Sequence, residues 1–264
     1  MFLLIDVGNT NMVIGLYENK SGFDNLKTIR LGTHGFETED ELFSHIYNLL
    51  KINDINIESI DSISVASVVP SVNYIIKKMG EKYFNSKTYF VDHTKRVFNI
   101  EYKAQYPHEI GPDRIANVIA ARKEYGENVI AIDFGTAITV DIIQNGDFVG
   151  GSITPGFKIS MQALFSNTAK LPQIELDIPN YNKGINTIDN LQIGIIKTTI
   201  YGLEKLIEEI QNEDQNIYKI ITTGGMAKNL KGKSKLFNNY VPDLTLKGIY
   251  YYMMSEKGEL KWNF

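Results

Sequence analysis

An apolar stretch that ends in aspartate and leads directly into a glycine-containing turn occurs twice in this chain. Residues 2–6 lead into Val7-Gly8-Asn9-Thr10, and residues 129–133 lead into Phe134-Gly135-Thr136. Continuous hydrophobicity of this kind is typical of a strand that is buried on both faces, and glycine permits a tight turn to the next strand. Because the same unit recurs, the sequence predicts two similar halves.

The elements around the two turns recur in the same order. Asn145-Gly146 is a strong hairpin signal that matches a hairpin expected after the first turn, and segment 218–223 corresponds to segment 62–69. Helices are predicted between the strands: a capping box at Thr38 precedes a helix over 39–51, and Pro112 can open another. Strands therefore alternate with helices in both halves, which places the chain in the α/β class.

A long helix is predicted over residues 187–211, where apolar residues recur at helical spacing. Gly194 and Gly202 interrupt it, and each costs about 1 kcal/mol relative to alanine. We expect compensation from close helix–helix contact, either within the fold or across a dimer.

Composition excludes several classes of protein. The 264 residues carry a formal net charge of −4 without a basic block, so the electrostatic footprint of a nucleic-acid-binding protein is missing. The absence of cysteine excludes disulfides, thiolate catalysis and cysteine-ligated metals. No segment has the length of a membrane span, and the N-terminal apolar run is too short for a signal peptide. We therefore expect a soluble cytoplasmic protein with neither nucleic-acid nor membrane partners.

The first turn has the composition of a phosphate-binding site. The missing side chain of Gly8 lets backbone N–H groups approach a phosphate, and short donors follow at Asn9, Thr10 and Asn11. Asp6 is placed to hold a hydrated Mg²⁺ against phosphate oxygens. A tight hairpin with an Asx turn is the alternative for an isolated motif, but the second copy at residues 133–136 favours the functional interpretation.

A third piece, Thr222-Thr223-Gly224-Gly225, lies at the end of the later strand. A Gly-Gly turn can lie flat against an adenine ring or a ribose, although a plain strand-to-helix turn is the commoner explanation. Together, and in this order, the three pieces resemble the acetate-kinase, sugar-kinase, Hsp70 and actin superfamily. That resemblance implies an α/β fold of two duplicated ribonuclease-H-like (actin-like ATPase) domains, over 1–115 and 116–264, with an ATP cleft between them.

The segment Gly111-Pro112-Asp113-Arg114 resembles the glycine-alanine-aspartate-arginine motif of the type III pantothenate kinase family, with Pro112 in place of alanine. Further blocks that resemble the family, in the family's order, are residues 6–13, 133–139, 150–156, 169–172, 186–187 and 242–246. The resemblance implies ATP-dependent phosphorylation of pantothenate to 4'-phosphopantothenate, the first step of coenzyme A biosynthesis. It also implies a homodimer that uses Mg²⁺ and either potassium (K⁺) or ammonium (NH₄⁺).

Asp113 is the predicted catalytic base, which accepts the proton of the substrate hydroxyl during phosphoryl transfer. Because it lies in the first turn of a helix, complementing the helix dipole is its alternative role. Arg114 can hold an anionic substrate or the transferring phosphoryl group, and a salt bridge is its alternative. The resemblance makes Asp133 the monovalent-cation ligand, with Mg²⁺ coordination as the competing role.

The other site residues follow from the same resemblance. It assigns ATP binding to Asp6, Val7, Gly8, Asn9, Thr10, Asn11, Met12, Val13 and Thr136. It assigns substrate binding to Gly111, Pro112, Asp113, Arg114 and Thr187, the last of which also fits a helix N-cap.

Two positions depart from the family pattern. Ile138 stands where the family commonly has threonine, and Ala104 stands where a substrate-facing tyrosine is usual, with Tyr102 and Tyr106 nearby. Two other functions stay open: a kinase of the same superfamily for another small alcohol, and a non-catalytic nucleotide-binding regulator of the Bvg accessory factor type. The segment around Asp113 argues against the first, and the retained acidic residues and Arg114 argue against the second.

Overall fold

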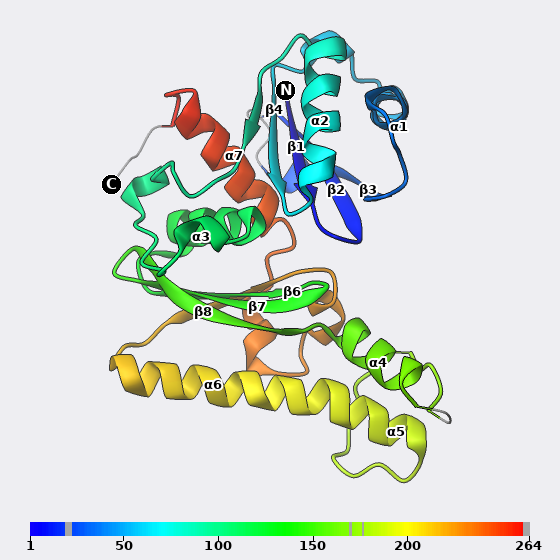
Figure 1. The fold of residues 1–264 in the computed structure, drawn as a ribbon. Coiled ribbons are helices and arrows are strands. Elements are labelled where there is room, and N and C mark those ends of the chain that lie inside the picture. The colour runs from blue at the N-terminus through cyan, green and yellow to red at the C-terminus, as the bar shows by residue number, and fades with distance from the viewer. Residues whose placement is uncertain (19–22, 169–170, 176, 261–264) are drawn as a thin grey trace. The chain divides into compact units, whose positions relative to one another are not determined.

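The computed structural model describes residues 1–18, 23–168, 171–175 and 177–260, so the first two residues of the family block 169–172 lie outside the described residues. The chain forms two compact units, Met1–Glu124 with Asp243–Phe264, and Tyr125–Pro242. Each unit is built on its own sheet (Figure 1). None of the helices in the described ranges is long and apolar enough to cross a membrane.

The first unit contains a five-stranded mixed sheet in the order β3-β2-β1-β4-β5. β1 (Phe2–Val7) and β2 (Asn11–Tyr17) form the hairpin predicted around the first turn, and β3 (Lys27–Gly32) pairs antiparallel with β2. β4 (Ser62–Ser67) and β5 (Thr88–Phe90) run parallel to β1 on its other side. The carboxyl ends of β1, β4 and β5 therefore share one edge of the sheet, where ligands bind in open α/β folds.

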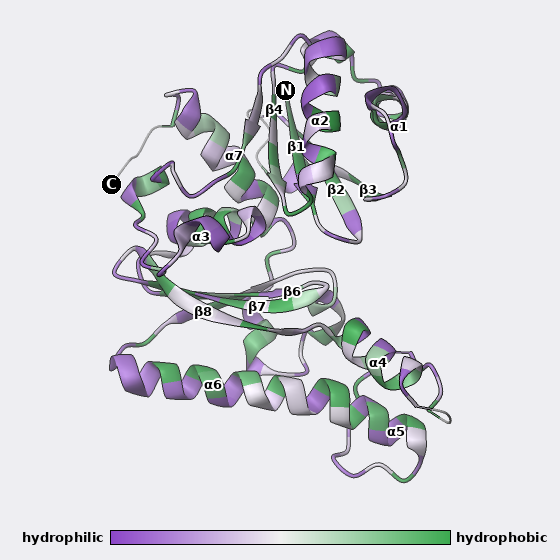
Figure 2. Cartoon of the chain, viewed as in Figure 1, coloured by the Kyte–Doolittle hydropathy of each residue, from purple (hydrophilic) through white to green (hydrophobic). Residues whose placement is uncertain are grey.

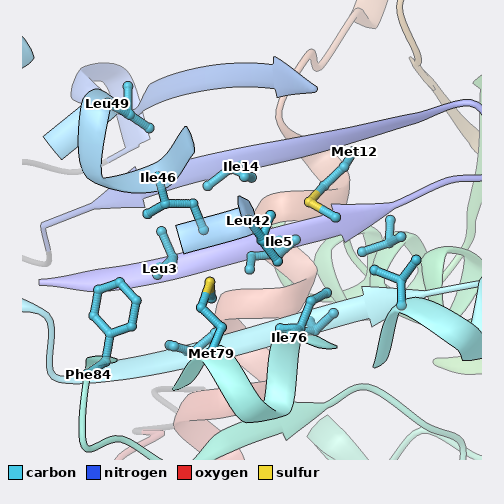
Figure 3. Packing of buried hydrophobic residues seen from close by; sticks show 14 of the residues in the cluster. Leu3, Ile5, Met12, Ile14, Leu42, Ile46, Leu49, Ile76, Met79 and Phe84 are labelled. Atoms are coloured by element: carbon cyan, nitrogen blue, oxygen red, sulfur yellow. The ribbon is translucent and has the colours of Figure 1, made fainter. Parts of the chain in front are cut away.

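Two helices cover one face of this sheet. α1 (Glu39–Ile52) begins at the predicted capping box of Thr38 and Glu41, and α2 (Pro70–Tyr83) begins with its proline. Their apolar faces pack on alternate residues of the strands (Figure 3). The buried set includes Leu3, Ile5, Met12, Ile14, Leu42, Ile46, Ile76 and Met79.

The opposite face is covered by α7 (Leu244–Glu256), which packs on β1 and β4. α3 (Pro112–Tyr125) lies against α7: Thr245 Oγ1 donates to Asn117 Oδ1 at 2.8 Å, and a side chain at Gly248 would collide with the backbone of Ala116. The first unit therefore includes most of α3 and the C-terminal helix, whereas the predicted division falls after residue 115. The difference arises because this helix–helix contact joins residues far apart in sequence.

The second unit repeats the strand topology in the order β8-β7-β6-β9. β6 (Val129–Phe134), β7 (Ala137–Gln144) and β8 (Asp147–Pro155) form an antiparallel meander, and β9 (Lys219–Thr223) runs parallel to β6. Tyr240 forms a parallel bridge to Thr222, in the place that β5 takes beside β4. The α/β class and the duplication of strand order are confirmed.

The predicted long helix is present, but it is not uniform. α5 (Thr187–Gln192) and α6 (Thr198–Asp214) are joined by a π-helical turn at Ile193–Lys197, and hydrophilic and hydrophobic positions alternate along α6 (Figure 2). A Cβ atom at Gly194 or Gly202 would meet no other atom within 4 Å. The expected close contact within the fold is therefore wrong for both glycines.

The other helical elements are short. α4 (Phe157–Ser166) follows β8. Turns of 3-10 helix occupy Phe23–Asn25, Ile57–Ser59, Val97–Asn99, Pro107–Glu109, Ala227–Leu230 and Lys235–Asn239.

Candidate active site

The first turn closes tightly between β1 and β2. Gly8 N donates to Asn11 O at 3.0 Å. A Cβ atom at position 8 would lie 3.1 Å from Asn11 O, a tight contact that a small shift of the turn would have to relieve. Asn9, Thr10 and Asn11 are exposed, which leaves them accessible to a ligand.

Thr33, the residue after β3, fastens this turn from within the unit. Its Oγ1 donates to Gly8 O at 2.6 Å, its N donates to Thr10 O at 3.2 Å, and the residue is 1% exposed. Because the N–H and C=O of a trans peptide point in opposite directions, anchoring the Gly8 carbonyl turns the Asn9 N–H away from Thr33. Sequence reasoning missed Thr33, which lies 25 residues after Gly8 and belongs to no recognisable motif.

The predicted ATP-binding residues differ in accessibility. Val7 and Met12 are fully buried in the core, so only their backbone atoms can contact a ligand. Asp6 and Val13, which pair across β1 and β2, are half-buried. Since side chains alternate along a strand, Asp6 points toward the sheet face that α7 covers.

The start of α3 lies at the same edge of the first sheet. Val68, which follows β4, donates its N–H to Val7 O at 3.1 Å, and its Cγ1 would be 3.6 Å from a Cβ atom on Gly111. The end of β1 therefore lies beside the end of β4, which in turn lies beside Gly111. The structure thus brings the first turn and the predicted substrate segment together within one unit.

Glycine at position 111 makes room for the Asp113 carboxylate. Ile115 N donates to Gly111 O at 3.0 Å, which starts α3 with Pro112 as its first residue, as predicted. Asp113 Oδ1 accepts from Arg114 N at 2.8 Å, and a Cβ atom on Gly111 would collide with that oxygen. A larger residue at position 111 would therefore displace the carboxylate.

Partial burial raises the pKa of the Asp113 carboxyl group above its ordinary value of 3.8. Removal from water is the largest cause, and the N–H group and the charge of Arg114 offset part of it. A carboxylate with a raised pKa accepts a proton more readily than an ordinary one, which suits a general base.

The two tyrosines near Ala104 lie in different surroundings. Tyr106 is 52% exposed and forms an edge contact with the ring of His108, their centroids 6.0 Å apart. Burial raises the pKa of the Tyr102 hydroxyl, and Tyr252 and Asp92 add to the effect. Tyr106 therefore presents an accessible ring just before α3, whereas Tyr102 is turned inward.

The second turn, in the other unit, is closed by backbone hydrogen bonds. Gly135 N donates to Ala137 O at 3.0 Å, and Gly156 N donates to Thr136 O at 3.0 Å. A Cβ atom on Gly156 would collide with the carbonyl oxygens of Gly135 and Thr136. Gly135 and Thr136 are exposed at the tip.

Gly224 brings the third predicted piece against the second turn. Its φ is +91°, and a Cβ atom there would lie 2.5 Å from Asp133 Oδ1 and 2.6 Å from Phe134 N. Met226 N also donates to Phe134 O at 3.3 Å. Ile138 is 1% exposed within the core, so this departure from the family pattern lies beneath the turn and not on its surface.

In the parts of the chain that the structure describes, no cluster of three or more His, Cys, Asp or Glu side chains is placed to hold a metal ion. Asp6 and Asp133 each offer one carboxylate at a strand end. Mg²⁺ in phosphate-transferring sites is commonly held by one or two carboxylates and the phosphates of the substrate. The donors present therefore suit a cation shared with bound phosphates.

Thr187 is the exposed first residue of α5. The N-cap is Asn186, whose Oδ1 accepts from Asp189 N at 2.9 Å. The alternative role of Thr187 as N-cap is therefore wrong, because the helix starts one residue earlier than that role requires.

A family model described as type III pantothenate kinase matches residues 2–209. The chain belongs to the type III pantothenate kinase family. It is 50% identical over 252 residues to the type III pantothenate kinase of Petrotoga mobilis, covering 96% of this chain and 97% of that protein. It is 41% identical over 249 residues to the type III pantothenate kinase of Kosmotoga olearia, covering 94% of each.

Solved structures with low sequence identity to this type III pantothenate kinase family member share its fold. A Baf family transcriptional activator from Campylobacter jejuni matches with a TM-score of 0.59 at 22% identity, over 98% of this chain and 100% of that one. The ethanolamine utilization protein EutJ from Carboxydothermus hydrogenoformans matches with a TM-score of 0.55 at 14% identity, over 95% and 89%. These likenesses show the fold alone, the actin-like and sugar-kinase fold with two ribonuclease-H-like domains.

Proposed function

We propose that this protein transfers the γ-phosphoryl group of ATP to the terminal hydroxyl of pantothenate. The product is 4'-phosphopantothenate, and the reaction is the first step of coenzyme A biosynthesis. Family membership supports the reaction. The observation that carries it is the Asp113 carboxylate, which Gly111 accommodates at the sheet edge that also bears the first turn. Because ATP is the donor, we place the reaction in the cytoplasm.

Asp113 acts as the general base in this proposal. Its carboxylate accepts the hydroxyl proton as the new P–O bond forms and the bond to ADP breaks. The raised pKa strengthens the base, and Pro112 fixes the helix start that holds it. Arg114 binds an anionic group of the substrate or of the transferring phosphoryl.

The turns bind the phosphates of ATP in this proposal. The first contributes the backbone of residues 6–13 with the exposed donors Asn9, Thr10 and Asn11, and the second contributes Thr136. Asp6 would hold Mg²⁺ and Asp133 would hold K⁺ or NH₄⁺. When bound, these cations neutralise charge on the phosphate oxygens.

We also propose a homodimer formed through the second unit. In its described part, large apolar side chains are exposed on β8, α4, α5 and the segment before α5, namely Ile153, Ile159, Leu164, Phe165, Tyr181, Ile185 and Ile188. α4 contacts the π-helical turn that follows α5, and exposed apolar side chains on neighbouring elements are typical of protein–protein contacts. Thr187 belongs to the same helix as Ile188, which supports a substrate contact near the interface. Light scattering should give a mass of about twice 29.9 kDa.

The test of the reaction is ATP-dependent phosphorylation of pantothenate with Mg²⁺, comparing K⁺ or NH₄⁺ against Na⁺. We expect product with the larger cations and a kcat reduced roughly 10³-fold in D113N, the loss typical of removing a general base. Full turnover by folded D113N would remove Asp113 from the mechanism. Product from a different alcohol alone would favour the related-kinase alternative, and ATP binding without any product would favour the regulator.

A further inference from the structure

A pocket of about 240 Å³ lies in the second unit, and its lining includes none of the residues assigned above to ATP, cation or pantothenate binding. Lys197 and Lys233 line it together with the ring of Tyr201 and the apolar side chains of Ile178 and Ile200. Positions 197, 200 and 201 fall on one side of a helix. Lys197 ends the π-helical turn Ile193–Lys197, and π-helical turns occur frequently at functional sites.

Lys197 is a buried ammonium group held by neutral oxygens. It is 8% exposed, and its Nζ donates to Tyr181 O and to Asn182 Oδ1, each at 2.7 Å. Taking an ammonium group out of water is costly unless an opposite charge compensates it. The two neutral oxygens accept from two of its three N–H groups and bring no negative charge, so an anion in the pocket would be attracted.

Lys233 adds a second positive charge to the lining of the pocket. Its Nζ donates to Asn180 Oδ1 at 3.2 Å, again a neutral oxygen. Within the described ranges neither lysine forms an ion pair, and the neighbouring carboxylate of Glu204 accepts from Ser234 Oγ at 2.6 Å.

We infer that this pocket binds a small phosphate ester. Two ammonium groups match a dianion, and lysine binds phosphate as a point charge. The apolar wall of Ile178, Ile200 and Tyr201 accommodates a short organic group beside the phosphate. The volume is below the roughly 300–1,000 Å³ of pockets that enclose drug-sized ligands, which favours an ester of a few carbon atoms. The site is independent of the proposed kinase reaction, because none of these side chains takes part in it.

The experiment follows the isoleucine δ1 methyl signals of Ile178 and Ile200 by NMR in the full chain, with glycerol 3-phosphate and inorganic phosphate as probes at constant ionic strength. We expect saturable shifts of both methyls, with tighter binding of the ester. K197M should weaken binding at least tenfold, roughly the effect of losing one charge-assisted contact. K205M is the matched control, because Lys205 lies on the same helix, exposed and paired with Glu208 and Glu209.

K233M keeps the test decisive if K197M does not fold, and a roughly threefold weaker binding is expected for it because its side chain is exposed. Absence of shifts at roughly 10 mM ester, well above typical metabolite-site affinities, would overturn the inference. Equal binding by the wild type and the folded lysine variants would overturn it as well. If inorganic phosphate bound as tightly as the ester, the inference that the pocket recognises a phosphate ester would be overturned.

Discussion

Each unit has a glycine-containing hairpin turn after its first strand, but the two turns are supported in different ways. In the first, the buried hydroxyl of Thr33 and its backbone N–H bind the carbonyls of Gly8 and Thr10. In the second, Gly156 and Gly224 approach so closely that neither has room for a Cβ atom. A substitution can therefore delete a side-chain hydrogen bond that supports the first turn, whereas the packing around the second turn leaves no room for a side chain at Gly156 or Gly224. Duplicated strand topology does not require duplicated support.

Among substitutions that test how the two turns are supported, G224A in the second unit is expected to have the largest effect. A Cβ atom would meet the Asp133 carboxylate and the backbone of Phe134, and the residue would have to keep φ at +91°. Displacement of a binding group by about 1 Å can cost roughly 100-fold in rate. We expect kcat/KM for ATP to fall by about that factor, measured by steady-state kinetics.

G258A is the matched control for backbone strain. Gly258 also has a positive φ, +71°, but a Cβ atom there meets nothing within 4 Å. Its cost should be confined to about 1–2 kcal/mol of stability, with kcat/KM within twofold of the wild type. If G224A behaved like G258A, the contact with Asp133 would be irrelevant to function.

T33V tests the hydrogen-bonded support of the first turn. Valine keeps the shape of threonine but leaves Gly8 O without its 2.6 Å partner. A hydrogen bond of this kind contributes roughly 1 kcal/mol, so the KM for ATP should rise about five- to tenfold with little change in kcat. T33S restores the hydroxyl and should recover most of the ATP affinity. A loss of stability in T33V without a change in KM would assign Thr33 to folding alone.

I138T tests whether residue 138 contributes only to the core of the second unit or also to ATP binding at its turn. Ile138 is 1% exposed, so threonine would lose buried carbon atoms and bury a hydroxyl. We expect the free energy of unfolding to fall by about 2 kcal/mol, with the KM for ATP unchanged. An improved KM would show that threonine at this position reaches the ligand.

Local features of the sequence predicted the fold well where they act over a few residues. The β1–β2 and β6–β7 hairpins, the capping box at Thr38 and the start of α3 at Pro112 follow from hydrophobic pattern, glycine and proline. The domain division was harder to predict, because α7 joins the first unit through contacts such as Thr245 with Asn117. The π-helical turn could not be predicted from the sequence, because apolar residues recur at helical spacing through it.

The candidate site shows the same limit. Gly8, Gly111 and Gly224 were recognisable because glycine marks tight turns and positions where a side chain would be crowded. Thr33 and the buried Lys197 were not, because their contacts come from segments that only the folded chain brings together. The burial of Val7 and Met12 could have been predicted, because successive side chains of a strand point to opposite faces of the sheet and one face is the core.

The smallest predicted effect concerns Asp113 in the first unit. Its charge either lowers the stability of the fold, because the carboxylate is buried, or raises it by interacting with the dipole of α3. The pKa of Asp113 is raised in the folded state by burial. The folded chain therefore binds this proton more tightly than the unfolded chain, and the stabilisation present below pH 3.8 is lost as pH rises through the folded pKa. At pH 7 the ionised carboxylate lowers stability. Uncharged D113N should melt about 2 °C higher, and this difference should vanish as the pH falls toward 4. A lower melting temperature for D113N at pH 7, measured by calorimetry, would instead support the helix-dipole role.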